Sequence, residues 1–595
     1  MTFHFSGGSM FPMNREVLSG CEAVALGAVR AGVNFISACP DKASDGIIDA
    51  VSKADSAVCA LDSRTGKSAA GVAAGACAAG CRTMVILNRE GLSDAAAPLS
   101  MLASAQSAGG FVVVSVDEDI YQFSSDSPDP RKFAGFAGIP VLEPSDPESA
   151  YLLTAAAFDI SERFRVPVML RATRRVIRGS STVGTLPLLA RHIPGGFNAG
   201  ALPDPVFHGE AAPAAEKLRE IAEEFDRQPI NSVSGSGRVG LVLCGAAGAA
   251  ALSCLPADAD VRVLRLSSCF PLPEKTVAKF LDGLDRALCV EYGAPVSEEQ
   301  LLMTAGRLRC GAEIHGKLDG ALPSPDDPGE LKKRVLDFIG VSAYTEDASA
   351  PADEKKPALC PGCPHRASLS AVKEATKGRE TVFCGDIGCS ALGRYEPVGI
   401  PDVTLCSGAS ASIARGIKKA LPGATVFAFI GDHTLLSGGA AGVAEAITNG
   451  SDMIVCVLDN SSPALSSSDS GRAPGPTAVA DILRALGAVW VGEADPLDLA
   501  AAKKTVAAAL EKSGPRAIVF TSPCARTLQK KAACSVDPVK CVKCGRCAQF
   551  TGCPAVRAET GAAAEIDRSA CAGCGLCAYY CPVGAISLSK GGERQ

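Results

Sequence analysis

Eight cysteines near the C-terminus form two runs of the same kind, C-x2-C-x2-C followed by a fourth cysteine and a proline. The first run contains Cys541, Cys544, Cys547 and Cys553, and the second contains Cys571, Cys574, Cys577 and Cys581. Cysteine thiolates are soft ligands, and three of them on one short loop can converge on a cubane of iron and sulfide. This spacing therefore constrains the end of the chain to fold around metal centres.

In modules with two such runs, the fourth ligand of each cluster comes from the other run. We expect one [4Fe-4S] cluster on Cys541, Cys544, Cys547 and Cys581, and the other on Cys571, Cys574, Cys577 and Cys553. C-x2-C pairs also bind zinc, but zinc needs neither a third cysteine in tandem nor the C-P that ends each run. The first run has five residues before its last cysteine, where three are usual, and we interpret this as a local insertion that removes no ligand.

The bulk properties of the chain exclude several classes of protein. Its 595 residues, 47% of them hydrophobic, can form about three to five domains with buried cores. The net charge is −6 without a basic block, so we expect no nucleic-acid partner. We see neither a signal peptide nor an apolar run of about 18 residues, so we expect no membrane span. The 26 cysteines are mostly cluster ligands or resemble buried thiols, which favours a reducing and anaerobic cytoplasm.

Short apolar strands alternate with helices rich in Ala and Gly along most of the chain. This alternation predicts an α/β fold class with several parallel sheets, followed by the iron–sulfur module. The expected parts are an α/β domain over 1–190, a linker with one helix over 191–236, an α/β domain over 237–345, a polar linker over 346–357, an α/β domain over 358–525 and a ferredoxin module over 526–595.

A second chemical motif lies in the third α/β domain. Gly431 and Asp432 follow the apolar strand 426–430, and Asn460 ends the strand 453–459. Both side chains are thus expected at the carboxyl ends of strands, where open α/β sheets bind ligands. The Asp432 carboxylate, the Asn460 amide oxygen and the Ser462 carbonyl would give a hard cation such as Mg2+ three oxygen ligands. We expect Gly438 and Gly439 to open the next helix, close to phosphate.

This spacing of Gly-Asp and Asn is the thiamine diphosphate motif. Alone it is only moderately specific, because a strand-end Asp and a turn Asn can also occur together by chance. Beside an iron–sulfur module, it indicates a 2-oxoacid:ferredoxin oxidoreductase.

Several longer motifs make the likeness specific. They are LPEKTVAKFL at 272–281, CPGCPHR at 360–366, GDIGC at 385–389, CSGAS at 406–410 and VLDN at 457–460. Together with the C-terminal runs, they resemble the alpha subunits of indolepyruvate:ferredoxin oxidoreductases over most of the chain and in the same order. The resemblance implies oxidation of an arylpyruvate with coenzyme A to an acyl-CoA and CO2, with reduction of ferredoxin. It also implies a smaller beta subunit and hence a hetero-oligomer.

The resemblance further implies domain roles and site residues. Residues 1–190 would be the thiamine pyrimidine-type domain, 237–345 a transketolase C-terminal-like domain, and 358–525 the diphosphate and Mg2+ domain. A third cluster is implied on Cys360, Cys363, Cys389 and Cys524, for which four buried thiols near a cofactor are the alternative. Gly408 and His365 are assigned to the cofactor pocket, although a histidine that only packs in the core is an equal alternative for His365.

One part of the family pattern is broken. The family places a carboxylate against the thiamine pyrimidine, in a W-S-x-N-E stretch that matches residues 62–66, and Gly66 stands at the position of the glutamate. The histidine of the next loop is replaced by Arg89. Three interpretations stay open: Asp62 or Glu90 acts instead, a different oxoacid is used by a variant relay, or the chain is a degenerate paralogue that serves as an electron-transfer or scaffold subunit. The catalytic residue is therefore unassigned, and a Gly66→Glu substitution that raised activity would show that the site lacks this group.

Overall fold

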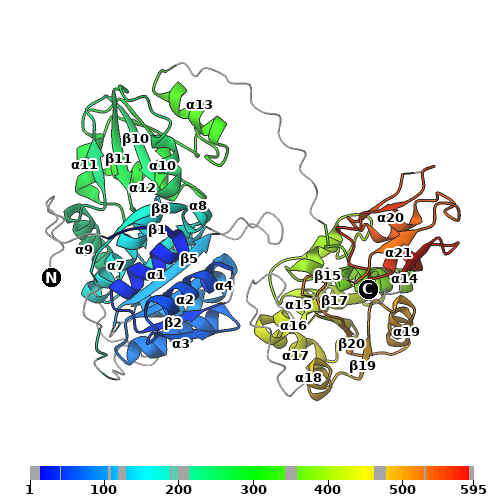
Figure 1. Ribbon diagram of the computed structural model, residues 1–595. Coiled ribbons are helices and arrows are strands. Elements are labelled where there is room, and N and C mark those ends of the chain that lie inside the picture. The colour runs from blue at the N-terminus through cyan, green and yellow to red at the C-terminus, as the bar shows by residue number, and fades with distance from the viewer. Residues whose placement is uncertain are drawn as a thin grey trace. The chain divides into compact units, whose positions relative to one another are not determined.

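The computed structural model describes residues 14–39, 42–104, 107, 109–117, 129–187, 192–194, 196, 214–341, 358–460, 478–527, 531–559 and 561–588. They divide into two compact units, one up to residue 341 and one from residue 358 (Figure 1). Both units contain parallel sheets with helices packed on their faces, and the predicted α/β fold class is confirmed. Within the described ranges, every helix is too short or too polar to cross a lipid bilayer.

The first unit is built on a seven-stranded sheet with the order β12-β6-β7-β5-β4-β2-β3. The strands are β2 Phe35–Ala38, β3 Cys59–Asp62, β4 Thr83–Asn88, β5 Phe111–Asp117, β6 Val141–Leu142, β7 Val168–Thr173 and β12 Ser268–Phe270. All pairs are parallel except β12 with β6. Strand β12 belongs to the segment expected as the second α/β domain, yet it completes this first sheet.

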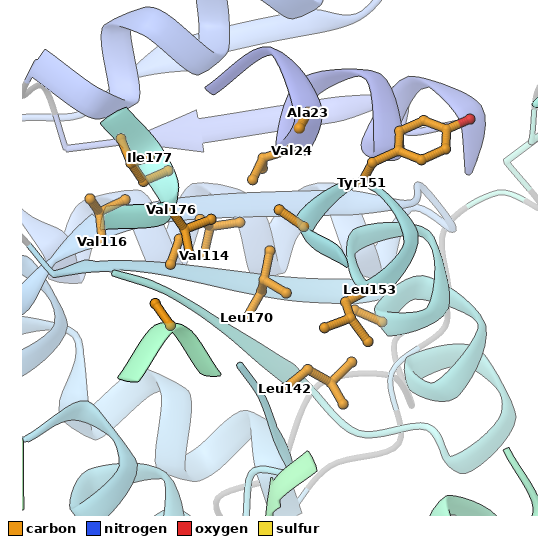
Figure 2. Close-up of a cluster of buried hydrophobic side chains, with 14 of the residues drawn as sticks. Ala23, Val24, Val114, Val116, Leu142, Tyr151, Leu153, Leu170, Val176 and Ile177 are labelled. Atoms are coloured by element: carbon orange, nitrogen blue, oxygen red, sulfur yellow. The ribbon is translucent and has the colours of Figure 1, made fainter. Parts of the chain in front are cut away.

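Helices cover both faces of this sheet because its strands are apolar on both sides. Helices α1 (Gly20–Arg30), α2 (Lys42–Ala54) and α7 (Pro147–Phe164) lie on one face, and α3 (Gly66–Ala78), α4 (Arg89–Asp94), α5 (Ala96–Ser104) and α6 (Pro130–Ala137) on the other. Strand β5 shows the alternation, since Val112 and Val114 belong to the first core and Phe111 and Val113 to the second. Figure 2 shows Val114 and Leu170 of the sheet below Val24 of α1.

A five-stranded sheet with the order β14-β13-β10-β11-β9 completes the first unit. Its strands are β9 Ser232–Ser234, β10 Val239–Cys244, β11 Val261–Leu266, β13 Arg286–Val290 and β14 Glu313–His315, and its helices are α10 Gly245–Leu252, α11 Glu274–Leu281, α12 Val296–Leu308 and α13 Pro328–Phe338. Helix α9 (Ala214–Arg227) lies in the predicted linker, but its Ile221 and Phe225 are buried in the core of the first sheet. The short strands β1 (Asn14–Ser19) and β8 (Ser180–Thr185) form a separate antiparallel pair.

A cluster of buried charges joins the two sheets of the first unit. Arg171 on β7 donates to Asp117 over 2.7 Å and to Glu143 over 2.9 Å. Arg131 on α6 donates to Asp129 over 2.8 Å and to Glu291, which follows β13 of the other sheet, over 2.6 Å. Burial opposes ionisation of Asp129, but the charges of Arg171 and Arg131 outweigh it and hold the pKa of this carboxyl well below its usual range.

Removal of Arg131 should destabilise the first unit. Arg131→Met leaves the carboxylates of Asp129 and Glu291 buried without this partner, and breaking a buried ion pair costs about 3–5 kcal/mol. We expect a clearly lower midpoint for the first unit in scanning calorimetry. The matched control is Arg238→Gln, which removes an exposed ion pair with Asp285 and should leave the midpoint unchanged. Equal midpoints for both variants would show that the cluster does not hold the sheets together.

The second unit contains a six-stranded parallel sheet with the order β16-β15-β17-β18-β20-β19. The strands are β15 Thr381–Gly385, β16 Val403–Thr404, β17 Thr425–Gly431, β18 Ile454–Asp459, β19 Trp490–Ala494 and β20 Arg516–Thr521. Helices α14 (Pro364–Ala375) and α19 (Leu499–Leu510) pack on one face, and α15 (Ser410–Ala420), α17 (Ala440–Thr448) and α18 (Val479–Ala485) on the other.

The cysteine runs form a small module with two matching halves. Strand β21 (Cys534–Val536) pairs with β24 (Ile586–Leu588), and β22 (Val556–Arg557) with β23 (Glu565–Ile566), both antiparallel. Helix α20 (Arg546–Thr551) lies in the first run and α21 (Leu576–Tyr579) in the second. Leu576 and Tyr580 are buried in the core that contains α14 and α19, so the module packs against that face of the sheet (Figure 1).

Candidate functional site

The cysteines of the two runs line two cavities in the second unit. The first, here called the inner cavity, is lined by Cys553, Cys571, Cys574 and Cys577 together with residues of the CPGCPHR motif. The second, the outer cavity, is lined by Cys541, Cys544, Cys547 and Cys581. Each cavity is thus lined by one of the two predicted sets of four thiols, in which three cysteines come from one run and the fourth comes from the other.

The local chemistry of both cavities fits iron–sulfur clusters. The N–H of Gly573 donates to Sγ of Cys571 over 3.4 Å, and the N–H of Ala585 to Sγ of Cys581 over 3.2 Å. Backbone N–H groups of Ala564 and Lys543 lower the pKa of Cys541. Hydrogen bonds of this kind favour the thiolate form, which is the form that binds iron, and they tune the reduction potential of a cluster.

Cys363 and Cys534 also line the inner cavity, and sequence reasoning missed Cys534. Cys534 is 2% exposed and hydrogen-bonds with the thiols of Cys577 and Cys571. It comes to this place because β21 pairs with β24 at the end of the module. No spacing rule could have identified it, since Cys534 precedes both runs and belongs to neither.

The four thiols of the implied third set also come together. Cys360 and Cys363 precede α14, Cys389 begins the short helix η2 (Cys389–Arg394), and Cys524 follows β20. Burial and then the charges of Cys360 and Cys524 raise the pKa of Cys389 to about 11. Burial and then Cys389 raise the pKa of Cys363 to about 12. Cys389 is thus within electrostatic range of each of the other three thiols. Among the described residues, however, no three His, Cys, Asp or Glu side chains are arranged closely enough to hold a metal ion, so this set stays a prediction.

The thiamine motif lies at one edge of the six-stranded sheet. Gly431 is opposite Leu458 on the neighbouring strand, and Asp459 is opposite Thr521 on the next. Asp432, Asn460 and the loop with Cys524 therefore all leave the sheet at its carboxyl edge, and both Asp432 and Asn460 are buried. Strands β16 and β17 lie on opposite sides of β15, which makes this edge a topological switch point, where open α/β sheets bind ligands.

His365 lies beside the asparagine of the motif. Its Nε2 is 3.5 Å from Nδ2 of Asn460, and burial lowers the pKa of the imidazole to about 4, so it is neutral at neutral pH. Among the described residues, no partner hydrogen-bonds to its buried Nδ1. The N–H of Cys524 donates to the carbonyl of Asn460 over 3.3 Å. This hydrogen bond connects the loop that carries a thiol of the third set with the loop that begins at Asn460. Ser462, the third expected Mg2+ ligand, lies outside the described residues.

Asp386 of the GDIGC motif holds the CSGAS loop. Its carboxylate accepts from N–H of Ser410 over 2.8 Å and from Oγ of Ser410 over 3.1 Å. Burial raises the pKa of Asp386 to about 7, although the N–H groups of the loop oppose this shift. The loop in turn places Gly408 against the backbone of Gly438 and Gly439. The motif had been noticed in the sequence, but nothing in its spacing assigned a role to Asp386.

The helix after β17 begins earlier than predicted. Helical turns start at Asp432 in α16 (Asp432–Thr434), continue through a π-helical segment, η3 (Leu435–Gly439), and then become α17. Gly438 and Gly439 therefore lie inside the helix instead of opening it. A π-helical turn is frequent at functional sites, and here it follows directly after the predicted Mg2+ ligand.

In the first unit, the position of the missing glutamate has no space for a side chain. A Cβ on Gly66, the first residue of α3, would lie 1.7 Å from the carbonyl oxygen of Gly91. A Gly66→Glu side chain would therefore clash with the backbone of Gly91, so this variant cannot test for the missing group unless the backbone shifts. The alternative Asp62 is exposed at the end of β3. Glu90 is half-buried, burial raises its pKa, and it directly precedes the glycine that packs on Gly66.

Arg89, which replaces the family's histidine, is held by the buried charge cluster of the same unit. Its Nε donates to Oδ1 of Asp117 over 2.8 Å, and Asp117 also accepts from Arg171. The substitution therefore extends the ion cluster of the first unit toward α4.

The raised pKa of Asp386 predicts a pH dependence of stability. Between the ordinary value of 3.8 and about 7, the folded state keeps a proton that the unfolded state releases, so stability should fall as pH rises through this range and level off above it. Asp386→Asn has no such titration, and its thermal midpoint should fall less between these pH values. The surface variant Glu380→Gln is the control and should follow the wild type. Parallel curves for Asp386→Asn and the wild type would contradict this prediction.

Two family models match parts of the chain. The C-terminal TPP-binding domain of thiamine pyrophosphate enzymes matches residues 386–520, and the 4Fe-4S binding domain matches residues 564–587. The first match spans the carboxyl edge with Asp386, Asp432 and Asn460, and the second spans the second cysteine run. They support a thiamine diphosphate domain and an iron–sulfur module.

Curated relatives match nearly the whole chain. Indolepyruvate oxidoreductase subunit IorA of Methanothermobacter marburgensis is 30% identical, with 92% of this chain and 93% of the relative covered. The subunit of the same name from Thermococcus kodakarensis is 31% identical, with 92% of both covered. Among solved structures, a 2-oxoglutarate:ferredoxin oxidoreductase from Magnetococcus marinus is 16% identical with a TM-score of 0.41, over 55% of this chain and 66% of that one. The identity and coverage of the curated relatives show that the chain belongs to the IorA family of indolepyruvate oxidoreductase subunits.

Proposed function

We propose that the chain is the thiamine-diphosphate-dependent subunit of an oxidoreductase that converts an arylpyruvate, such as indolepyruvate, and coenzyme A into an acyl-CoA and CO2 while ferredoxin is reduced. The observation that carries this proposal is the carboxyl edge of the second unit. There the N–H of Cys524, after β20, donates to the backbone carbonyl of the thiamine motif residue Asn460, after β18, so that the proposed cofactor site and a proposed cluster thiol lie on neighbouring loops.

The residues at this edge fit thiamine diphosphate and Mg2+. Asp432 and Asn460, together with Ser462, would hold the cation through oxygen atoms. The first turn of α15, which begins at Ser410 after Gly408, would bind the diphosphate through the backbone N–H groups that follow Ser410, because the N–H of Ser410 itself donates to Asp386. When bound, thiamine supplies the carbon nucleophile and the electron sink for decarboxylation. His365 is neutral and buried beside Asn460, so it would orient ligands there without adding charge.

The cysteine sets would carry the electrons away. We assign one [4Fe-4S] cluster to the inner cavity, one to the outer cavity, and a third to Cys360, Cys363, Cys389 and Cys524. Four thiolates suit each cubane. Free ferredoxin is the proposed acceptor, and a smaller beta subunit the proposed partner in a hetero-oligomer. A reducing, anaerobic cytoplasm is the setting that such oxygen-sensitive centres require.

The proposed carboxylate at the pyrimidine is Glu90. Gly66 has no side chain and no space for one, whereas Glu90 is half-buried next to Gly91. Burial raises the pKa of Glu90 and also that of the exposed Asp62, so the choice of Glu90 rests on its place beside Gly91. A carboxylate with this character is suited to share a proton with a ring nitrogen.

The Glu90→Gln variant tests this role. It should lower turnover about 10^2- to 10^4-fold, as expected for the loss of a general acid–base group, without loss of thiamine diphosphate. Turnover is measured anaerobically with the beta subunit present, as arylpyruvate- and CoA-dependent reduction of a viologen dye, and bound cofactor is measured by release and fluorescence. Asp62→Asn is the matched control. If Asp62→Asn lost turnover and Glu90→Gln kept it, the carboxylate would be Asp62.

The second candidate function is an electron-transfer or scaffold subunit without decarboxylase activity. The closed space at Gly66 favours this alternative, because it removes the group that starts the chemistry in the family. The same assay separates the two functions. Cluster-loaded wild-type protein that binds thiamine diphosphate but reduces no dye with any 2-oxoacid would be a scaffold.

A further inference from the structure

One charged side chain lies between the cofactor edge and the iron–sulfur module. Arg366, the last residue of the CPGCPHR motif, is 3% exposed and lines the inner cavity. On one side its guanidinium donates to the carbonyls of Leu359 and Cys360. On the other side it donates to the carbonyls of Thr551 and Gly552, the latter over 2.9 Å. It thus bridges the loop of the third thiol set and the loop that leads to Cys553.

The unusual length of the first cysteine run creates this bridge. Helix α20 has six residues, whereas its counterpart α21 in the second run has four, and this difference equals the difference between the five-residue and three-residue gaps. The added length ends at Thr551 and Gly552, whose carbonyls bind Arg366. Thr551 is fully buried, and its hydroxyl donates to the carbonyl of Cys547 over 2.6 Å. The inserted residues therefore supply the carbonyl groups to which Arg366 donates.

The charge of Arg366 is not neutralised by a carboxylate. Within the described residues, the guanidinium has only neutral carbonyl partners and its buried Nε has none. Burial lowers the pKa of Arg366, and the thiols of Cys553, Cys363 and Cys574 oppose this shift. A buried cation without a counter-ion is costly, and the groups near it that can carry negative charge are the cysteines of the inner cavity and of the CPGC loop.

The outer cavity lacks such a group. Its lining, within the part of the chain that the structure describes, contains no charged side chain. Lys543 influences Cys541, but Lys543 is exposed, and water and salt screen its charge. The CPGC loop approaches only the inner cavity, where a Cβ on Gly362 would lie 2.5 Å from Cβ of Ala572. The two cavities therefore differ in electrostatic environment although their cysteine sets match.

We propose that Arg366 is the fixed counter-cation of the inner cluster and raises the reduction potential of that cluster above the potential of the outer cluster. Reduction adds one electron and no proton, which makes the cluster more negative by one charge. A cation fixed in a medium of low dielectric constant stabilises this reduced state more than the oxidised state. Electrons that enter from the side of the third thiol set then settle first on the inner cluster. This inference rests on the proposed iron–sulfur role of the cavities.

The test compares Arg366→Met with Arg366→Lys in the full chain, purified anaerobically with its clusters. Each is reduced stepwise with dithionite and mediators, and each reduced cluster is followed by electron paramagnetic resonance. Cys574→Ser identifies the signal of the inner cluster. At a fixed potential, Arg366→Met should lower the ratio of reduced to oxidised inner cluster at least tenfold, which is about 59 mV for one electron, and change the outer ratio less than threefold. Arg366→Lys keeps the charge and should stay close to the wild type.

Two controls keep the test decisive. Lys543→Gln removes an exposed cation beside the outer run and should change either ratio less than threefold. If Arg366→Met loses iron from the inner cavity, the comparison moves to Arg366→Gln against Arg366→Lys, which both keep hydrogen-bond donors and differ in charge. An unchanged inner ratio in the neutral variants, or equal shifts of both clusters, would overturn the role of Arg366. A wild-type protein without iron would instead refute the proposed function itself.

Discussion

Parallel pairing in the second unit is the constraint on which the candidate site depends. Because β15, β17, β18 and β20 run in one direction and in close register, the loops after them emerge at one edge. That edge receives Asp386, Asp432, Asn460 and Cys524 from segments far apart in the sequence. The helices that return each strand cover both faces, and the face with α14 also carries the cysteine module. The residues proposed to hold the cofactor and the clusters are thus positioned by the same backbone hydrogen bonds.

The features that could be predicted from the sequence are those that follow from residue spacing or from a pattern within a short stretch of the chain. Cysteine spacing gave two sets of thiols, and each set lines its own cavity because the module folds as two matching halves. Strand-end positions placed Asp432 and Asn460 at one edge, since the carboxyl ends of parallel strands coincide. The confirmed family and α/β fold class followed from motifs and from alternating elements in the same way. The domain boundaries and the ligand roles themselves stay predictions.

The features that escaped prediction depend on contacts between distant segments. Cys534 reaches the inner cavity only through the pairing of β21 with β24, and the space at Gly66 is closed by Gly91 of another helix. The helix start at Asp432 was misplaced because a glycine pair usually marks a boundary, whereas here it is accommodated in a π-helical turn. The partners of Arg131 are spread from Asp129 to Glu291, so no local pattern reveals them.

The two additional residues of α20 have a consequence for how such a chain can be assembled from parts. A freestanding two-cluster ferredoxin with the usual short gap has no carbonyls in the position of Thr551 and Gly552. If such a ferredoxin were fused to a thiamine domain by a linker, the guanidinium of Arg366 would therefore lack these two carbonyl acceptors. Covalent attachment alone would therefore not provide the hydrogen bonds by which Arg366 joins the two parts. The two additional residues of the first cysteine run thus supply the carbonyls through which the module is hydrogen-bonded to the thiamine-type domain.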